Sequence, residues 1–354
     1  MDHRKKTKEI KIGALKIGGG NPIVVQSMTK TKTSDIDATV RQIHDLEKAG
    51  CQIVRCAVPD KESALALKEI KKQINIPLVA DIHFNHNYAL MAIEAGVDKI
   101  RINPGNIGDL EKIKSIVSAA KERKIPIRVG INSGSLEKDI RKHYQNHVTA
   151  EGLVKSALKN VRILEDLGFF DIVISLKATS VPMTIQAYQA IAKKTKYPLH
   201  VGITEAGIPK IGIVRSAVGM GVLLAQGIGD TIRVSLTGDP IEEVRVGYEI
   251  LKSLELTFHG VTFISCPTCG RAEVDVVSIA QQVEERTQHI KQPLRVAIMG
   301  CEVNGPGEAA DADVGLAAGV GVGLIFREGE VVRKVPEAEM IDALVDEIES
   351  MAIK

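Results

Sequence analysis

The stretch Lys99-Ile100-Arg101-Ile102-Asn103-Pro104 decides the fold. Polar and apolar side chains alternate along it, as they do in a β-strand that has two different faces. Arg101 and Asn103 share one face, while Ile100 and Ile102 occupy the other. Charged residues near the carboxyl end of an otherwise apolar strand are typical of a β/α barrel, in which inward positions at the strand ends converge on the active site.

The same alternation recurs along the chain. Asp81 and His83 are two residues apart, and so are Arg233 and Ser235. Short apolar strands are predicted at 23–28, 53–58, 77–83, 99–104, 126–132, 171–177, 199–205 and 231–237, each followed by a helical pattern. Eight such units predict an α/β fold in the form of a (β/α)8 TIM barrel. An open, doubly wound sheet is the alternative, which the even spacing disfavours.

The pattern changes after about residue 253. A strand at 262–264, a helix at 275–289, a strand at 294–299, a glycine-rich alternating stretch at 314–335 and a last helix at 336–352 predict a small α+β domain. We therefore expect a barrel domain at 1–255 and a second domain at 256–354. Residues 8–19 read as a hairpin that closes the bottom of the barrel.

Composition excludes several classes of protein. The chain has 354 residues, 46 basic and 44 acidic, and its net charge of +2 gives no general attraction to nucleic acid or membrane. Aromatic residues make up only 3% and tryptophan is absent, which argues against a base-stacking surface. The sequence contains neither a run as long as a membrane helix nor an apolar signal core at its start. We expect a cytoplasmic protein.

Cations outnumber acids at the predicted barrel mouth. Its five candidate cations face two candidate acids, Asp81 and Glu205; the cations are Arg55, Arg101, Arg128, Lys177 and Arg233. Buried cations need partners, and the simplest partner for this excess is an anion with several charges, such as a phosphate ester. Alternatively, some of these side chains point outward to helix carboxylates. The basic loop at 133–148 either steers a phosphate or is merely solvated.

Three of the five cysteines lie in the second domain. Cys266 and Cys269 form a C-x-x-C pair in Ser265-Cys266-Pro267-Thr268-Cys269-Gly270, and Cys301 follows a predicted buried strand. Three thiolates fit an iron–sulfur cluster or a structural zinc ion, for which His259, Glu302 or Glu308 could be the fourth ligand. A redox pair and ordinary packing remain open. Cys51 and Cys56 are expected in the core.

Several longer phrases resemble one enzyme family. They are Val25-Gln26-Ser27-Met28-Thr29, Ala80-Asp81-Ile82-His83-Phe84, Lys99-Ile100-Arg101-Ile102-Asn103-Pro104-Gly105-Asn106, Gly202-Ile203-Thr204-Glu205-Ala206-Gly207, the C-x-x-C phrase and Met299-Gly300-Cys301-Glu302-Val303-Asn304-Gly305-Pro306-Gly307-Glu308. Together they resemble the two-domain bacterial 4-hydroxy-3-methylbut-2-enyl diphosphate synthases. The resemblance runs from about residue 8 to 350.

The resemblance implies an iron–sulfur oxidoreductase of the non-mevalonate isoprenoid pathway. Its reaction would be the reductive ring opening and dehydration of 2-C-methyl-D-erythritol 2,4-cyclodiphosphate to 4-hydroxy-3-methylbut-2-enyl diphosphate. Reduced flavodoxin or ferredoxin would supply two electrons. The resemblance also implies a homodimer in which the cluster domain of one subunit closes over the barrel of the other.

Residue roles follow from the same resemblance. It implies a [4Fe–4S] cluster on Cys266, Cys269, Cys301 and Glu308. The implied diphosphate contacts are Arg55, His83, Arg101, Arg128, Lys177, Arg233 and Ser235. The side chains that would orient the substrate are Asp81, Asn103, Asn132 and Thr204. Glu205 is the candidate acid for the hydroxyl that leaves.

Two other functions remain possible on the residues alone. One is a phosphate-ester barrel enzyme, such as a pterin-synthase-like transferase, with a zinc-bearing second domain. The other is a cluster carrier or redox sensor without turnover. Metal and sulfide content separates the first from the oxidoreductase, and turnover separates the second.

Overall fold

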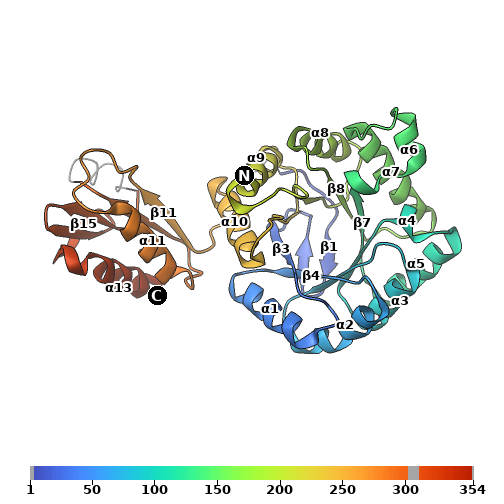
Figure 1. The fold of residues 1–354 in the computed structure, drawn as a ribbon, viewed down its shortest axis with the longest axis horizontal. Coiled ribbons are helices and arrows are strands. Elements are labelled where there is room, and N and C mark those ends of the chain that lie inside the picture. Colours follow the sequence, from blue (N-terminus) through green and yellow to red (C-terminus); the bar gives the residue numbers. More distant parts are fainter. Residues whose placement is uncertain (1–3, 302–310, 353–354) are drawn as a thin grey trace. The chain divides into compact units, whose positions relative to one another are not determined.

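The computed structural model describes residues 4–301 and 311–352. The chain divides into two compact units, Met1–Thr257 and Phe258–Lys354. The first is a barrel ringed by helices, and the second is a sheet with helices packed on it (Figure 1). Among the described residues, no helix is long and apolar enough to cross a membrane.

Eight parallel strands form the barrel. They are β3 (Val24–Met28), β4 (Ile53–Ala57), β5 (Leu78–Asp81), β6 (Lys99–Ile102), β7 (Ile127–Asn132), β8 (Ile172–Lys177), β9 (His200–Val201) and β10 (Thr231–Ile232). Hydrogen bonding runs in order from β3 to β8, and β10 joins β3 to β9. A parallel bridge between Ile174 and Leu199 links β8 to β9 and closes the ring. The predicted TIM barrel is confirmed, and the open sheet is wrong.

A helix follows each strand, as predicted. The eight are α1 (Ile36–Lys48), α2 (Lys61–Gln73), α3 (His86–Glu94), α5 (Leu110–Arg123), α7 (Ala150–Asp166), α8 (Val181–Ala192), α9 (Pro209–Ala225) and α10 (Pro240–Ser253). Most begin at a side chain that accepts a backbone N–H, such as Asp35, Asp109 or Thr149. Such caps satisfy N–H groups that have no partner within the helix.

Three short elements lie in the loops after β6 and β7. These are α4 (Pro104–Ile107), η1 (Ser133–Ser135) and α6 (Lys138–His143). Residues 133–148 were predicted as one basic loop after the fifth strand, and the structure places η1 and the short helix α6 within it. Ile140 in α6 is buried in the core, and this contact explains why the segment folds back on the barrel.

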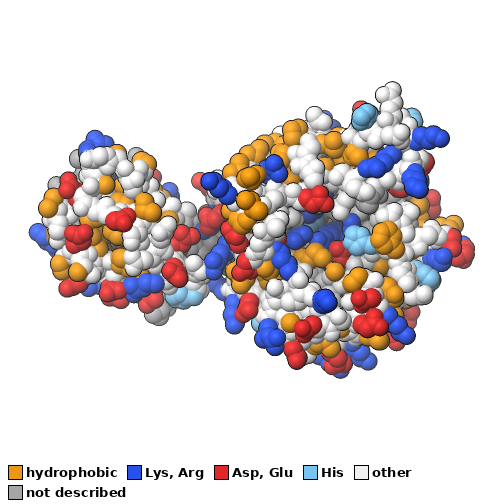
Figure 2. Space-filling model, in the orientation of Figure 1, with side chains coloured by type: hydrophobic (Ala, Val, Ile, Leu, Met, Phe, Trp, Pro, Cys, Tyr) orange, Lys and Arg blue, Asp and Glu red, His pale blue; other side chains and the backbone are white. Residues whose placement is uncertain are grey.

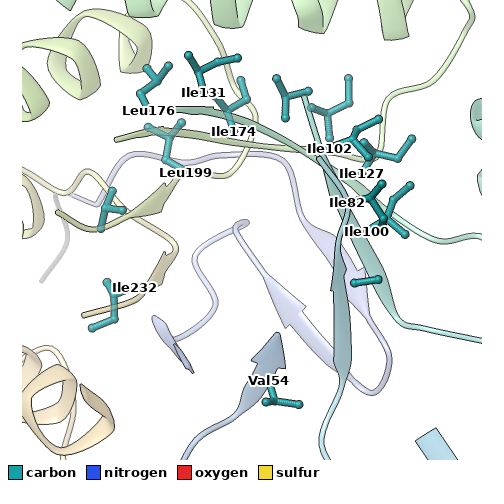
Figure 3. Packing of buried hydrophobic residues seen from close by; sticks show 14 of the residues in the cluster. Val54, Ile82, Ile100, Ile102, Ile127, Ile131, Ile174, Leu176, Leu199 and Ile232 are labelled. Carbon is teal, nitrogen blue, oxygen red and sulfur yellow. The ribbon is translucent and has the colours of Figure 1, made fainter. Parts of the chain in front are cut away.

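Alternate strand residues build two different layers. The outward set, including Val54, Ile100, Ile102, Ile127 and Ile174, packs under the helices as one large core (Figure 3). The inward set at the start of the strands packs on the hairpin of β1 (Ile10–Ile12) and β2 (Leu15–Ile17). The hairpin closes the bottom of the barrel, as predicted, so that polar inward residues remain only further up.

The second unit contains a mixed five-stranded sheet. Its strands are β11 (Val261–Ser265), β12 (Leu294–Met299), β13 (Val314–Gly319), β14 (Val322–Arg327) and β15 (Glu330–Pro336), adjacent in that order. The first three are parallel and the last two antiparallel to their neighbours. Helices α11 (Val276–Thr287) and α13 (Met340–Ala352) cover its core, and η2 (Glu337–Glu339) precedes α13. The predicted α+β architecture is confirmed.

Candidate functional site

The carboxyl ends of the barrel strands surround a hollow with lysine and arginine side chains at its floor (Figure 2). On the described barrel strands and directly after them, six cations are buried or nearly so: Arg55, Lys99, Arg101, Arg128, Lys177 and Arg233. Lys99 was not among the predicted five. The nearby buried acids are Asp81 and Glu243. The predicted excess of positive charge is therefore present.

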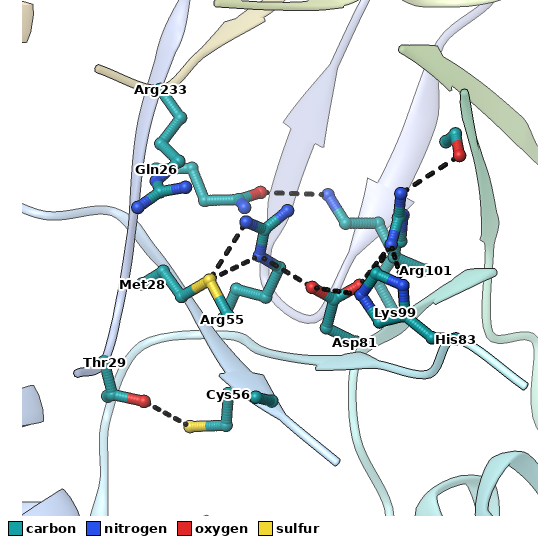
Figure 4. Close-up of polar contacts among 12 residues, drawn as sticks. Gln26, Met28, Thr29, Arg55, Cys56, Asp81, His83, Lys99, Arg101 and Arg233 are labelled. Carbon is teal, nitrogen blue, oxygen red and sulfur yellow. Dashed lines mark hydrogen bonds and ion pairs between the residues drawn. The ribbon is translucent and has the colours of Figure 1, made fainter. Parts of the chain in front are cut away.

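Asp81 is the centre of the first group of contacts (Figure 4). Its carboxylate lies 3.0 Å from Arg101 Nη1, 3.6 Å from Arg55 Nε and 3.5 Å from His83 Nε2. Arg55 also donates to the Met28 sulfur at 3.0 Å. Burial alone would raise the pKa of Asp81, but Arg55 and Arg101 hold it well below its usual value. One carboxylate thus serves two arginines, which leaves positive charge uncompensated.

Arg128 is the least compensated cation. It is 1% exposed, and its Nε and Nη1 have no hydrogen-bond partner. Burial, and then the charges of Arg55 and Arg101, hold its pKa well below the usual value. The pKa of Lys177 is lowered in the same way, by burial and then by Arg233 and Arg128. A ligand with negative oxygens would satisfy these groups.

A polar layer lies inside the barrel with Arg128. Lys99 is fully buried and donates to Gln26 Oε1 at 3.5 Å. His200 is also fully buried, with Nδ1 2.7 Å from Thr231 Oγ1 and no partner for Nε2. Burial and the surrounding cations hold the pKa of His200 well below its usual value, so its ring is neutral.

Glu243, in α10, is a charged partner that sequence reasoning missed. It is 1% exposed and lies 3.2 Å from both Arg233 Nη2 and Lys30 Nζ. It also accepts the Leu236 N–H at 3.0 Å. Arg233 is thus partly neutralised within the chain, as Arg55 and Arg101 are by Asp81. Glu205, the other predicted acid, is exposed and lines the pocket at this end of the barrel.

Two glycines make room for the buried cations. A Cβ atom on Gly130 would lie 2.3 Å from Arg101 Nε. A Cβ on Gly202 would lie 2.3 Å from the Arg233 carbonyl oxygen and 2.8 Å from Lys177 Nζ. Any side chain at either position would displace a cation of the site, so these glycines are needed for space rather than for backbone freedom.

A pocket of about 400 Å³ opens beside the cation group. His83, Asn132, Thr204 and Glu205 line it, together with Arg141 from the basic loop. Glu205 has a left-handed backbone, with φ of +52°, which is uncommon for a residue other than glycine. The structure therefore brings together four of the predicted substrate-site residues at one opening.

The remaining predicted substrate residues lie near this opening. Asn103 is 2% exposed, and neither polar atom of its side chain has a partner. It directly follows strand β6 and is two residues after Arg101. Ser235 is half-buried, two residues after Arg233 and beyond the end of β10. An orphaned buried amide requires an explanation, and a bound ligand supplies one.

The cysteines of the second unit lie on neighbouring segments. Cys266 follows β11 and Cys301 follows the adjacent parallel strand β12. The Gly300 N–H donates to Cys266 Sγ at 3.3 Å, and Arg271 hydrogen bonds hold the pKa of the Cys269 thiol below its usual value. Glu308, the predicted fourth ligand, lies outside the described residues, as does Glu302.

These residues fit a thiolate-held group in their chemistry. Sulfur that accepts a backbone N–H and a thiol with a lowered pKa both favour the charged ligand form. Thr268, between the two cysteines of the pair, has φ of +51°, which turns the chain back sharply. Among the described residues, however, no three His, Cys, Asp or Glu side chains are grouped closely enough to hold an ion.

Cys51 and Cys56 are buried in the barrel core, as predicted. Burial raises the pKa of Cys51 to about 12 and that of Cys56 to about 11. The Thr29 hydroxyl lies 3.5 Å from Cys56 Sγ. These two thiols have no part in the site.

The fold and site define a TIM-barrel protein with an excess of buried positive charge in its barrel and a cysteine-bearing second unit. Residues 7–248 match the family described as the GcpE TIM-barrel domain, and residues 262–350 match the GcpE protein C-terminal domain. The chain belongs to the GcpE family, which confirms the predicted resemblance.

Curated relatives agree over nearly the whole chain. A protein of Caldanaerobacter subterraneus subsp. tengcongensis is 60% identical over 348 residues, covering 98% of each chain. One of Geobacillus thermodenitrificans is 58% identical over 350 residues, covering 99% of this chain and 93% of its own. Both are named 4-hydroxy-3-methylbut-2-en-1-yl diphosphate synthase (flavodoxin).

A solved structure resembles the barrel more distantly. Dihydropteroate synthase from Stenotrophomonas maltophilia, with imidazole bound in its active site, matches with a TM-score of 0.51 and 12% identity. The match covers 70% of this chain and 97% of that one. At this identity the likeness shows a shared fold alone, and it gives no support to the transferase alternative.

Proposed function

We propose that this chain is an iron–sulfur oxidoreductase that converts 2-C-methyl-D-erythritol 2,4-cyclodiphosphate to 4-hydroxy-3-methylbut-2-enyl diphosphate. The observation that carries the proposal is the excess of buried, incompletely paired cations in the barrel mouth. A diphosphate is the kind of ligand that satisfies several of them at once. The relatives that match nearly end to end bear the same name.

The diphosphate would be bound by the cations and by two neutral donors. Arg128 and Lys177 have the most to gain, because they lack a carboxylate partner among the ion pairs of the described residues. Arg55 and Arg101, which both pair with Asp81, can redirect some of their N–H groups from its carboxylate to phosphate oxygens. His83, Arg233 and Ser235 complete the proposed set.

The rest of the substrate would be oriented by side chains with free or adaptable polar atoms. Asn103 offers both an acceptor and a donor from a buried position. Asn132 and Thr204 line the adjoining pocket, and Asp81 holds the arginines in place. These groups would present the carbon skeleton of the substrate to the open side of the barrel, where Glu205 lies.

The reaction needs a proton at the hydroxyl that leaves. Ring opening breaks one C–O bond to the diphosphate, and dehydration breaks a second C–O bond, while two electrons and two protons are taken up and water is released. Glu205 lines the pocket and is solvent-accessible, so it can be reprotonated between turnovers. The arginines would stabilise the diphosphate oxygen that becomes free.

A [4Fe–4S] cluster is the proposed source of electrons at the site. Cys266, Cys269 and Cys301 would hold it, with Glu308 as the fourth ligand. When bound, such a cluster transfers single electrons at a potential that its ligands and hydrogen bonds tune. The Gly300 N–H and Arg271 would contribute to that tuning. Reduced flavodoxin or ferredoxin is the proposed donor, and a homodimer is the proposed working state.

The test is turnover by anaerobically purified protein. Incubation with the cyclodiphosphate and reduced flavodoxin should give the linear diphosphate at a rate proportional to protein concentration. Phosphorus NMR measures the formation of this product. Cys301→Ser serves as the matched control and should give none. Binding of the substrate without any conversion, under a strong chemical reductant and with the cluster present, would overturn the proposal in favour of a cluster carrier.

A further inference from the structure

The segments after β6 and β7 are joined by a partly buried hydrogen-bond network that the proposed chemistry does not use. Asn160 and Ser156 lie one helical turn apart on α7, and both are fully buried. Asn160 Oδ1 accepts the Gly105 N–H at 2.7 Å, and Asn160 Nδ2 donates to Glu137 Oε1 at 2.9 Å. Ser156 Oγ donates to Glu137 Oε2 at 2.5 Å.

Each end of this network leads directly to the site. Gly105 is two residues after Asn103, in α4, whose first turn is stabilised by an N–H bond from Asn106 to the Asn103 carbonyl. Glu137 begins α6 and is three residues after Gly134, which lines the same pocket as Asn132. One amide on α7 therefore holds the two loops that carry Asn103 and Asn132.

The contact is also close enough to fix the position of the loops. A Cβ atom on Gly105 would lie 2.9 Å from Glu137 Oε1, so the segment after β6 packs directly against the Glu137 carboxylate of the segment after β7. Among the described ion pairs, none involves Glu137. Its two oxygens are instead satisfied by neutral donors, so the geometry depends on Asn160 and Ser156 rather than on a mobile lysine.

The unpaired Asn103 side chain explains how this network could affect the site. The Asn103 side chain has no partner of its own to set its direction, since both of its polar atoms are unpaired. Its orientation therefore comes from the backbone of 103–106. We infer that Asn160 is a positioning residue: it holds the Asn103 loop against Glu137, so that the Asn103 amide faces the substrate without reorganising. This inference rests on the proposed function.

An exchange of the two polar side chains tests this inference. Asn160→Asp places a carboxylate against Glu137 and removes the N–H donor, so we expect kcat/KM for the cyclodiphosphate to fall about 100-fold, as a misplacement of about 1 Å can cause. In the double variant Asn160→Asp with Glu137→Gln, the new amide donates to the new carboxylate, and the Gly105 N–H keeps its acceptor. This variant should recover most of the activity.

Lys159→Ala is the matched control. Lys159 is next to Asn160 on α7 and pairs with Asp139 of α6 at 3.1 Å, but both side chains are exposed. It bridges the same two helices without touching the Asn103 loop, so its loss should leave kcat/KM within about two-fold of the wild type, as surface ion pairs are worth little.

Thermal unfolding of the holoenzymes separates positioning from folding. If Asn160→Asp is too unstable to purify, Ser156→Ala, which removes one bond to Glu137, replaces it, with a smaller loss expected. The inference is overturned if either single variant keeps wild-type kcat/KM, or if the double variant regains thermal stability but not activity. Wild-type enzyme without turnover would refute the proposed function instead, so the two failures are distinguishable.

Discussion

Replacing Arg128 with methionine should stabilise the ligand-free protein and weaken substrate binding. Arg128 is 1% exposed and has two unpartnered nitrogen atoms, and burial and the charges of Arg55 and Arg101 lower its pKa. A buried polar group without a partner costs about 1–3 kcal/mol, and methionine fills a similar volume without that cost. At about 2–4 °C per kcal/mol, the melting temperature of the barrel should rise by roughly 2–12 °C.

Substrate affinity should change in the opposite direction. A hydrogen bond to a charged group contributes about 1.5–3 kcal/mol, which corresponds to a rise in Kd of roughly 10–150-fold. Thermal unfolding without ligand gives the first quantity, and calorimetric titration with the cyclodiphosphate gives the second. Arg41→Met, on the exposed face of α1, is the control and should change neither. A variant that is less stable and binds normally would show that Arg128 is a structural residue.

Three further substitutions or treatments have defined outcomes. Glu205→Gln should keep the Kd for the substrate but lose about 10²–10⁴-fold in kcat, and unchanged kcat would remove Glu205 from the mechanism. Gly130→Ala should displace Arg101, whose Nε would lie 2.3 Å from the new Cβ, and should lower the free energy of unfolding by about 1–3 kcal/mol. The control is Gly221→Ala on α9, which has open space around it and should be neutral or stabilising. Equal effects of the two substitutions would contradict the steric reasoning. Burial raises the pKa of Cys51 to about 12 and that of Cys56 to about 11, so iodoacetamide at pH 8 should label neither thiol until the protein unfolds. Mass spectrometry measures the labelling. Rapid labelling of the native protein would place these thiols at the surface.

Alternation along the strands was sufficient to predict the barrel and most of its interior cations. The side of a strand on which a residue lies depends only on its position in a two-residue repeat, so Arg101 and Asn103 could be assigned to one face without a structure. Arg55, Asp81 and Arg128 follow the same rule. Their placement inside the barrel agrees with the burial of each.

Partners from distant elements could not be predicted in this way. Glu243 lies on α10, next to Glu242, in a pattern that is typical of an exposed first helical turn. Only the packing of α10 on β3 brings it to Arg233 and Ser27. Glu205 shows the reverse case: it is the last residue of the strand predicted at 199–205, but strand pairing ends at Val201, and the segment beyond carries Glu205 to an exposed position.

The loop network was missed for a related reason. Asn160 and Ser156 have the spacing of a buried helical face, but polar residues on such a face give no sign of what they bind. Glu137 lies in the stretch 133–148, which was predicted as a basic loop without any stated contact to the Asn103 segment. Hydrogen bonds between residues separated by 19 to 55 positions in the chain are set by tertiary packing. The unpaired atoms of Asn103 were likewise visible only in the structure.

The most direct test of the proposed electron path is the iron and acid-labile sulfide content of protein purified under argon. Thiolates on Cys266, Cys269 and Cys301 should give iron and sulfide in equal amounts, about four of each per chain, and Cys301→Ser should lose both together with the brown colour. One zinc ion per chain without sulfide would contradict an oxidoreductase and would make the second unit a structural metal domain.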